Sequence, residues 1–200
     1  MRVLRLLLWA LVPIAAFAAG AYYYSASQRP APQQAGIAAD APLGGPFRLV
    51  DQNGEPVTEA IFRDKPSAVF FGFTHCPDIC PTALSEMAVW IESLGADADR
   101  MRFVFVTVDP ERDTPEALKD YLGAFSERLV GLTGEPEAVD AMLRDHHVYY
   151  KKVPLEGGDY SMDHSASIFL LNDKGGLAGT ISPSEPHEAG LAKLQRLVAG

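Results

Sequence analysis

Residues 67–81 read SAVFFGFTHCPDICP, and this stretch decides the fold. Ser67–Phe73 is a short run of small, β-branched and aromatic residues, which is typical of a strand buried on both faces. Pro81 then predicts a helix over Pro81–Leu94, because proline is favoured at the first helical position. A buried strand that leads directly into a helix, with two cysteines between them, indicates an α/β fold whose chemistry lies at the end of the strand.

The rest of the chain from Phe47 onward continues with short apolar strands and helices. Phe47–Val50 and Val57 flank Asn53-Gly54, a pair that predicts a hairpin. Further strands are expected at Arg102–Val108, Val148–Val153, Ser167–Leu171 and Leu177–Ile181, and further helices at Pro115–Phe125, Glu135–His146 and His187–Val198. This order of elements predicts an α/β fold, a thioredoxin-like sandwich with an added N-terminal hairpin.

The composition is acidic. The chain has 200 residues, with 17 Lys and Arg against 26 Asp and Glu and a net charge of −9. This balance argues against a basic nucleic-acid-binding protein, so we expect no nucleic-acid partner. No acidic residue precedes Asp40, whereas residues 40–200 hold 14 basic and 26 acidic side chains, a net charge of −12. The N-terminal segment therefore differs in composition and charge from the acidic remainder of the chain.

The acid-free segment contains an uncharged apolar stretch, Leu6–Tyr24. At about 1.5 Å for each residue, a helix of this length would just cross a hydrocarbon core of about 30 Å. Arg2 and Arg5 precede it, so the positive-inside rule predicts a transmembrane anchor with residues 1–5 in the cytoplasm. A cleaved signal peptide is the alternative, but the apolar part of such a peptide is usually only about 7–15 residues long.

Residues 25–46 are rich in Pro, Ala, Gln and Gly and lack apolar periodicity. This composition predicts a flexible tether between the anchor and a folded domain at 47–200. The leader has no Arg- and Ser-rich amphipathic stretch before its apolar run, which favours a bacterium over a mitochondrion. We therefore expect a single-pass protein of the bacterial inner membrane with its C-terminal domain in the periplasm.

Cys76 and Cys80 are the two cysteines of the chain, and each is followed by proline. A residue before proline is displaced from helical backbone angles, so Cys80 is expected at the cap of the helix that Pro81 begins. A helix N-terminus favours anions, which predicts that at least one thiol ionises more easily than a free thiol. A structural disulfide is the alternative, although closing so short a loop removes little entropy from the unfolded chain.

Two thiolates are soft ligands that select Cu(I), zinc or iron–sulfur clusters, and all of these need further ligands. His164 is the best candidate among the five histidines, because in a thioredoxin-like sheet the loop before the next strand faces the cysteine loop. Asp163 is the expected partner that orients the imidazole. His75 is less suitable, since adjacent side chains on an extended segment point to opposite faces. Two thiolates and a neutral imidazole suit Cu(I) and balance the charge of Cu(II).

Several other polar residues have ordinary structural explanations. His146 and His147 are expected at a helix end, where a cation is favourable, and His187 is expected on the surface. Asp109 and Asp113 follow a strand. They either present acidic groups beside the cysteine loop or serve as turn and capping residues.

Three blocks lie in order along the chain: GFTHCPDICP at Gly72–Pro81, VDPERDTPEALKDYLGAF at Val108–Phe125 and DHSASIFLLNDKG at Asp163–Gly175. Together they resemble the SCO/SenC family of membrane-tethered, thioredoxin-like copper proteins. The resemblance implies copper, as Cu(I) or Cu(II), bound by Cys76, Cys80 and His164. It also implies a chaperone that delivers copper to the dinuclear centre of cytochrome c oxidase subunit II, with other periplasmic copper or thiol-redox proteins as further partners.

Two other functions use the same residues. A thiol–disulfide oxidoreductase would keep the cysteines of the partner reduced, since a dithiol that binds Cu(I) can also form a disulfide. The CxxxC spacing differs from the CxxC of thioredoxins, so a metallochaperone is the leading interpretation, ahead of an enzyme. A copper or redox sensor is the third alternative. Peroxidase activity is disfavoured, because Thr74-His75-Cys76 lacks the Thr-x-x-Cys spacing of peroxiredoxins.

Overall fold

The structure is a computed structural model that describes residues 43–200. The expected anchor at Leu6–Tyr24 and most of the expected tether at 25–46 lie outside the described residues. Within residues 43–200, none of the helices combines the length and the apolar character that a membrane crossing needs.

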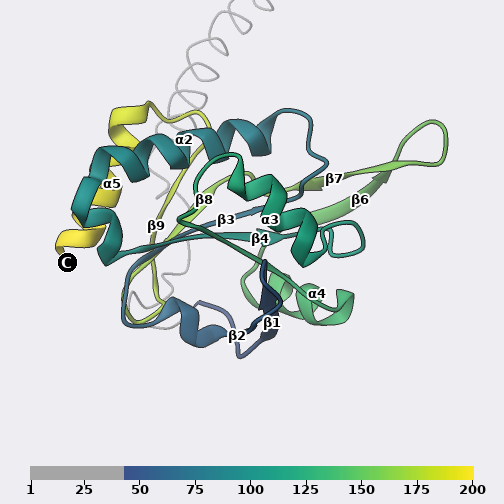
Figure 1. Ribbon diagram of the computed structural model, residues 1–200, viewed down its shortest axis with the longest axis horizontal. Helices are drawn as coiled ribbons and strands as arrows, with labels where there is room; N and C mark the ends of the chain where they lie inside the picture. Colours follow the sequence, from purple (N-terminus) through teal and green to yellow (C-terminus); the bar gives the residue numbers. More distant parts are fainter. Residues whose placement is uncertain (1–42) are drawn as a thin grey trace, which may run out of the picture. The chain divides into compact units, whose positions relative to one another are not determined.

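A seven-stranded sheet forms the centre of the domain, with its strands in the order β2-β1-β5-β4-β3-β8-β9 (Figure 1). The bounds of its strands are β1 Arg48–Asp51, β2 Pro56–Thr58, β3 Ser67–Gly72, β4 Arg102–Thr107, β5 Leu129–Thr133, β8 Ile168–Leu171 and β9 Leu177–Ile181. The three central strands β3, β4 and β5 are parallel, and their outer neighbours pair antiparallel. This is the thioredoxin-like α/β sheet that the sequence predicts, and the expected hairpin adds β1 and β2 at one edge.

The buried core lies on both faces of β3. All six side chains of this strand are buried, as its unbroken apolar run predicts. Phe70 packs on Phe105 of β4 with ring centroids 6.1 Å apart. Phe71 packs on Phe169 of β8 at 5.3 Å. Since successive side chains of a strand point to opposite faces, these two contacts anchor the two layers of the core.

Helices cover both faces of the sheet (Figure 1). One side carries α2 (Ile79–Leu94), α3 (Pro115–Gly123) and α5 (His187–Ala199), and the other carries α4 (Pro136–Asp145). Two 3-10 helices, η1 (Glu59–Phe62) and η2 (Gly95–Arg100), join elements of the domain. Thr114 caps α3 by accepting a hydrogen bond from the Ala117 N–H, and Pro115 takes the first helical position. The sequence therefore predicts these helices to within about two residues at each end.

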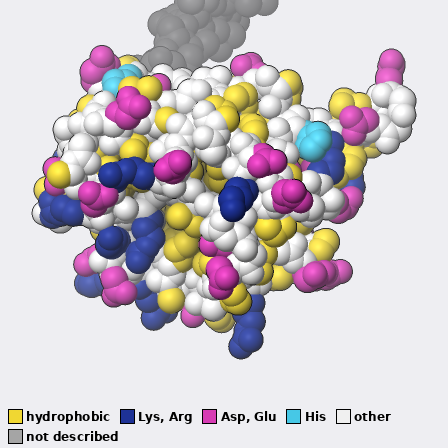
Figure 2. Space-filling view, in the orientation of Figure 1, with side chains coloured by type: hydrophobic (Ala, Val, Ile, Leu, Met, Phe, Trp, Pro, Cys, Tyr) yellow, Lys and Arg dark blue, Asp and Glu magenta, His cyan; other side chains and the backbone are white. Residues whose placement is uncertain are grey.

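One expected strand belongs to a separate ribbon. β6 (Tyr150–Pro154) pairs antiparallel with β7 (Tyr160–His164), and the pair projects from the domain (Figure 1). Gly157 and Gly158 form its turn with φ values of 89° and 88°. Hydrophobic side chains lie on this ribbon at the surface (Figure 2), among them Leu155, which is 51% exposed. The sequence predicts His164 in a loop before the next strand, but His164 is instead the last residue of the strand β7.

β5 has no counterpart among the strands that the sequence predicts. The reason lies in Gly131 at its centre, because glycine weakens a strand pattern. The structure shows why glycine stands there: a Cβ atom at this position would lie 2.6 Å from Cδ1 of Leu122 in α3. Gly131 thus lets α3 pack closely on the sheet, and that close approach is a tertiary feature that a local pattern does not contain.

Candidate metal centre

The loop between β3 and α2 carries both cysteines. α2 begins at Ile79, two residues before the expected start at Pro81, so Cys80 lies in its first turn and not at its cap. The Cys76 N–H donates to the carbonyl of Phe73 at 3.3 Å. The Cys80 N–H donates to Sγ of Cys76 at 3.4 Å. Early helical N–H groups have no partner within the helix, so the bond to Cys76 satisfies one of them and folds the two thiols toward each other.

Cys80 is completely buried, whereas Cys76 is half-buried, and both are free thiols. Burial raises the pKa of the Cys80 thiol far above its ordinary value, and the nearby negative charges of Cys76 and Asp113 add to this effect. Cys80 is therefore not the more easily ionised thiol that the sequence predicts at the helix start. The loss of solvation changes the pKa of Cys80 more than the helix N-terminus does. The thiol therefore stays protonated until a metal ion displaces the proton.

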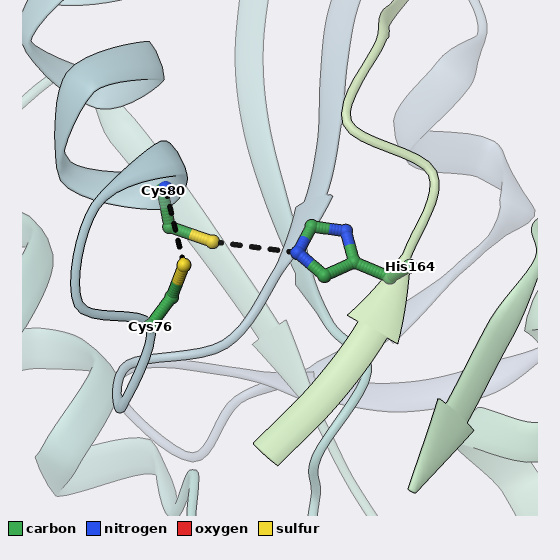
Figure 3. Close-up of side chains that lie close together, drawn as sticks. All are labelled: Cys76, Cys80 and His164. Carbon is green, nitrogen blue, oxygen red and sulfur yellow. Dashed lines mark hydrogen bonds between the residues drawn. The ribbon is translucent and has the colours of Figure 1, made fainter. Parts of the chain in front are cut away.

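His164 is the last residue of β7, and its imidazole points at the two sulfur atoms (Figure 3). Nε2 of His164 lies 3.6 Å from Sγ of Cys80. The other ring nitrogen, Nδ1, lies 2.9 Å from the carbonyl of Ser165. A carbonyl only accepts, so Nδ1 carries the proton and Nε2 presents a lone pair toward the sulfur atoms. Burial lowers the pKa of His164, which keeps the ring in this neutral form.

The three predicted residues converge. The two Sγ atoms of Cys76 and Cys80 and a ring nitrogen of His164 all lie within 4.8 Å of one another. Within residues 43–200, no other group of three or more His, Cys, Asp or Glu side chains is close enough to hold one metal ion. Two sulfur ligands and one imidazole are a soft donor set that suits copper or zinc. The sequence analysis thus selects side chains that the fold brings to one point from segments 84 residues apart.

The other histidines lie outside this group. His75 is exposed, and its Nδ1 lies 3.0 Å from Oγ1 of Thr74. His187 stacks on Trp90 and pairs with Glu86 at 2.6 Å. The geometry is in keeping with the reduced suitability of His75 as a ligand, and His187 is a partly exposed residue that contacts α2.

Asp163 does not orient His164. Its exposed carboxylate accepts a hydrogen bond from the hydroxyl of Tyr149 at 3.3 Å, while the backbone carbonyl of Ser165 takes the orienting role. A backbone carbonyl is present at every residue, so the sequence does not reveal which one accepts this hydrogen bond. The adjacent acid is therefore the residue that the sequence suggests.

Asp113 is a buried structural residue. It is fully inaccessible, and its carboxylate accepts hydrogen bonds from the Thr74 hydroxyl at 2.6 Å, the Thr74 N–H at 3.1 Å and the Thr107 hydroxyl at 2.6 Å. Burial raises its pKa while these hydrogen bonds oppose the change. Thr74 begins the cysteine loop, so Asp113 ties that loop to β4. Asp113 therefore lies beside the cysteine loop, as the first of the two expectations has it, whereas the residue that caps the helix is Thr114.

His146 is buried on the opposite face of the sheet, and the expectation of a cation at a helix end is wrong for it. Its ring packs against Phe47, Phe62 and Phe71 at centroid distances of 6.0 to 6.3 Å. Nδ1 lies 2.8 Å from the carbonyl of Met142. Burial lowers the pKa of His146, so the fold holds the neutral ring.

This burial predicts a pH dependence of stability. An unfolded histidine takes up a proton as the pH falls below about 6.5, whereas folded His146 takes it up only at lower pH. The stability that neutral His146 contributes is therefore complete above about pH 6.5 and is lost as the pH falls toward its lowered folded pKa. We expect the free energy of unfolding, measured with denaturant, to fall from pH 7 to pH 5 and His146→Gln to flatten this slope. An unchanged slope in the variant would contradict the assignment, because His164 contributes equally to both proteins.

This chain is similar to known proteins over most of its length. The SCO1/SenC family model matches residues 35–199. Protein SCO2, mitochondrial, from Saccharomyces cerevisiae is 37% identical over 161 residues, which are 78% of this chain and 53% of that protein. The chain spans about half the length of the first curated relatives that it matches.

Two solved structures resemble the fold and carry metal. Bradyrhizobium japonicum ScoI with copper bound is 44% identical, with a TM-score of 0.73 over 78% of this chain and 99% of that chain. Yeast Sco1 with copper bound is 34% identical, with a TM-score of 0.73 over 80% of this chain and 90% of that chain. Both likenesses extend over nearly all of the residues that the structure describes.

Proposed function

This chain belongs to the SCO1/SenC family, and from that premise we propose that it is a copper chaperone which carries Cu(I) or Cu(II) on Cys76, Cys80 and His164. Copper is here the cargo that is passed on. The observation that carries the proposal is the convergence of two Sγ atoms and one imidazole nitrogen within 4.8 Å. Copper bound to two relatives of the same fold supports the choice of copper over zinc.

Binding requires the loss of thiol protons. A metal ligand is the thiolate, and burial raises the pKa of Cys80, so copper has to displace the proton of this thiol. His164 needs no such step, because its ring is held neutral with the proton on Nδ1. Two thiolates and a neutral ring leave a site charge of −1 with Cu(I) and 0 with Cu(II), which suits either oxidation state.

The position of the cysteine loop suits transfer by ligand exchange. Cys80 is buried behind the site, whereas Cys76 is half-buried and Ile79 between them is 43% exposed. A thiolate of a partner can therefore approach copper from the side of Cys76, form a bond as the bond to Cys76 breaks, and so share the ion before release. Each exchange keeps the coordination number, which avoids a bare copper ion.

The partner and location that we propose follow from the sequence. The blocks at 72–81, 108–125 and 163–175 support delivery to the dinuclear centre of cytochrome c oxidase subunit II. The apolar stretch Leu6–Tyr24 supports an anchor in a bacterial inner membrane with residues 47–200 in the periplasm. Incubation of the copper-loaded chain with the metal-free copper domain of subunit II tests delivery. Copper should move to subunit II, and retention of all copper by this chain would count against delivery.

Replacement of the ligands tests the site. Cys76→Ser and Cys80→Ser should each lose stoichiometric copper, while His164→Ala should keep weaker Cu(I) binding through two thiolates, with affinity reduced about tenfold or more. Equilibrium competition with a Cu(I) chelator measures these affinities, and circular dichroism checks that each variant is folded. Stoichiometric copper in Cys80→Ser at wild-type affinity would refute the ligand set.

One observation favours a second function. Both cysteines are free and the Cys80 N–H donates to Cys76 Sγ, so the two sulfur atoms are already close. A dithiol in this arrangement can also reduce a partner disulfide. The deciding measurement is turnover of an oxidised partner by metal-free protein in the presence of a chelator. Efficient turnover would favour thiol reduction over copper delivery.

A further inference from the structure

β7 depends on side chains for its position beside the main sheet. Its ladder partner is β6, and the two form a sheet separate from the seven-stranded one. Tyr160, Met162 and His164 lie on the same face of β7, because side chains two residues apart share a face of a strand. Contacts that fix the position of Tyr160 at the start of β7 therefore also affect the position of His164 at its end.

The turn after β4 supplies the first of these contacts. Asp109 is 3% exposed, and its carboxylate accepts a hydrogen bond from the Tyr160 hydroxyl at 2.8 Å. The same carboxylate accepts from Nε of Arg112. A buried carboxylate with a charged donor and a hydroxyl donor makes strong, directional bonds. The start of β7 is therefore fixed to the turn at Asp109.

Arg112 makes the remaining contacts with the start of β7. Its Nη1 donates to the carbonyl of Tyr160 at 3.0 Å and to the carboxylate of Asp159 at 3.3 Å. The guanidinium carbon lies 3.8 Å from the centroid of the Tyr160 ring, a cation–π distance. Its side chain is 18% exposed, so these contacts are shielded from solvent. Arg112 thus contacts the backbone, the ring and the neighbouring acid of β7 at once.

The same guanidinium also contacts the ring beside the metal centre. It lies 5.9 Å from the centroid of Phe73, the residue that precedes the cysteine loop. Phe73 in turn packs edge-to-face on His164, with centroids 5.7 Å apart and an interplanar angle of 89°. Arg112 therefore contacts the two elements that surround His164, β7 on one side and Phe73 on the other.

We propose that Arg112 is a positioning residue, which places His164 opposite Cys76 and Cys80. Its guanidinium is hydrogen-bonded to Asp109 and lies over the ring of Tyr160. This inference rests on the proposed copper function. Arg112 does not bind the ion and acts only through His164. Removal of its contacts leaves the two cysteines in place and lets β7 move, so the nitrogen ligand is affected and the sulfur ligands are not.

Two variants separate the contacts. Arg112→Lys keeps the charge but loses the planar fork that contacts Asp109, Tyr160 and Asp159 together. Tyr160→Phe keeps the ring and removes the hydroxyl that donates to Asp109, and this milder change keeps the test valid if Arg112→Lys fails to fold. Arg144→Lys is the matched control, since Arg144 forms an exposed ion pair with Asp140 in α4.

The experiment is a double-mutant cycle on Cu(I) affinity, measured by chelator competition. With His164 present, Arg112→Lys should weaken binding about tenfold, Tyr160→Phe less, and Arg144→Lys should have no effect. In a His164→Ala background, Arg112→Lys and Tyr160→Phe should weaken binding no further. Electron paramagnetic resonance of the Cu(II) form should show reduced nitrogen coupling in Arg112→Lys.

Two results would overturn the positioning role. One is an equal loss of affinity from Arg112→Lys with and without His164, which would mean that Arg112 acts through the whole domain. The other is wild-type affinity and nitrogen coupling in both Arg112→Lys and Tyr160→Phe. Failure of the wild-type chain itself to bind copper would instead refute the proposed function, so the two failures are distinguishable.

Discussion

Replacement of Asp113 by alanine is expected to destabilise the domain and to release the cysteine loop. The carboxylate accepts from the Thr74 hydroxyl, the Thr74 N–H and the Thr107 hydroxyl, so its removal takes the acceptor from three donors, of which the Thr107 hydroxyl is buried and those of Thr74 are half-buried. At about 1–3 kcal/mol for an unsatisfied buried group and less for each half-buried one, the free energy of unfolding should fall by roughly 2–5 kcal/mol.

The loss of copper binding should accompany the loss of stability. Thr74 lies two residues before Cys76, so the bonds to Asp113 fix the start of the loop that carries both thiols. Denaturant unfolding measures the first effect, and chelator competition under conditions where the variant is folded measures the second. Asp120→Ala is the matched control, because Asp120 is an exposed acid on α3. A change of less than about 1 kcal/mol in Asp113→Ala would contradict the structural role.

Replacement of Gly72 by alanine is the second large effect that we expect. A Cβ atom at this position would lie 2.9 Å from Sγ of Cys80, 2.9 Å from Cε2 of Phe105 and 3.1 Å from Cε1 of Phe70. These atoms belong to buried side chains, which cannot move away from the added methyl group without disturbing the core. Overpacking of this kind costs about 1–3 kcal/mol.

The displacement should also reach the metal site. Movement of Sγ of Cys80 away from Gly72 changes its distance to Cys76 and His164, and we expect Cu(I) affinity to fall about tenfold or more. Chelator competition tests this, with Gly123→Ala as control, because a Cβ at Gly123 meets no atom within 4 Å. Equal affinities of Gly72→Ala and Gly123→Ala would show that the contact with Cys80 does not matter.

Much of the site is predictable because its residues carry local signals. Cys76 follows the buried strand β3, Cys80 lies in the first turn of α2, and His164 precedes β8, the next strand of the main sheet. The order of strands and helices indicates the fold, and the fold then implies that these loops meet. The three candidate ligand residues follow from that reasoning without knowledge of any distance.

The parts that the sequence misses depend on contacts between distant segments. β7 reads YSMDH, a short segment in which Tyr160 and Met162 alternate with the polar Ser161 and Asp163, so its strand signal is weak, although Gly157-Gly158 between the two strands is a turn signal. The pKa of Cys80 depends on its burial in the folded domain, which raises it despite the position at a helix start. The roles of Asp109, Arg112 and Asp113 depend on partners 39 to 51 residues away.

The central claim is that Cys76, Cys80 and His164 together bind one copper ion. X-ray absorption at the copper edge, on the wild-type chain, His164→Ala and the matched control His75→Ala, tests it most directly. The account predicts two sulfur ligands and one imidazole nitrogen in the wild type and in His75→Ala, and loss of the imidazole scattering in His164→Ala alone. An unchanged spectrum in His164→Ala, or loss of imidazole in His75→Ala, would contradict it.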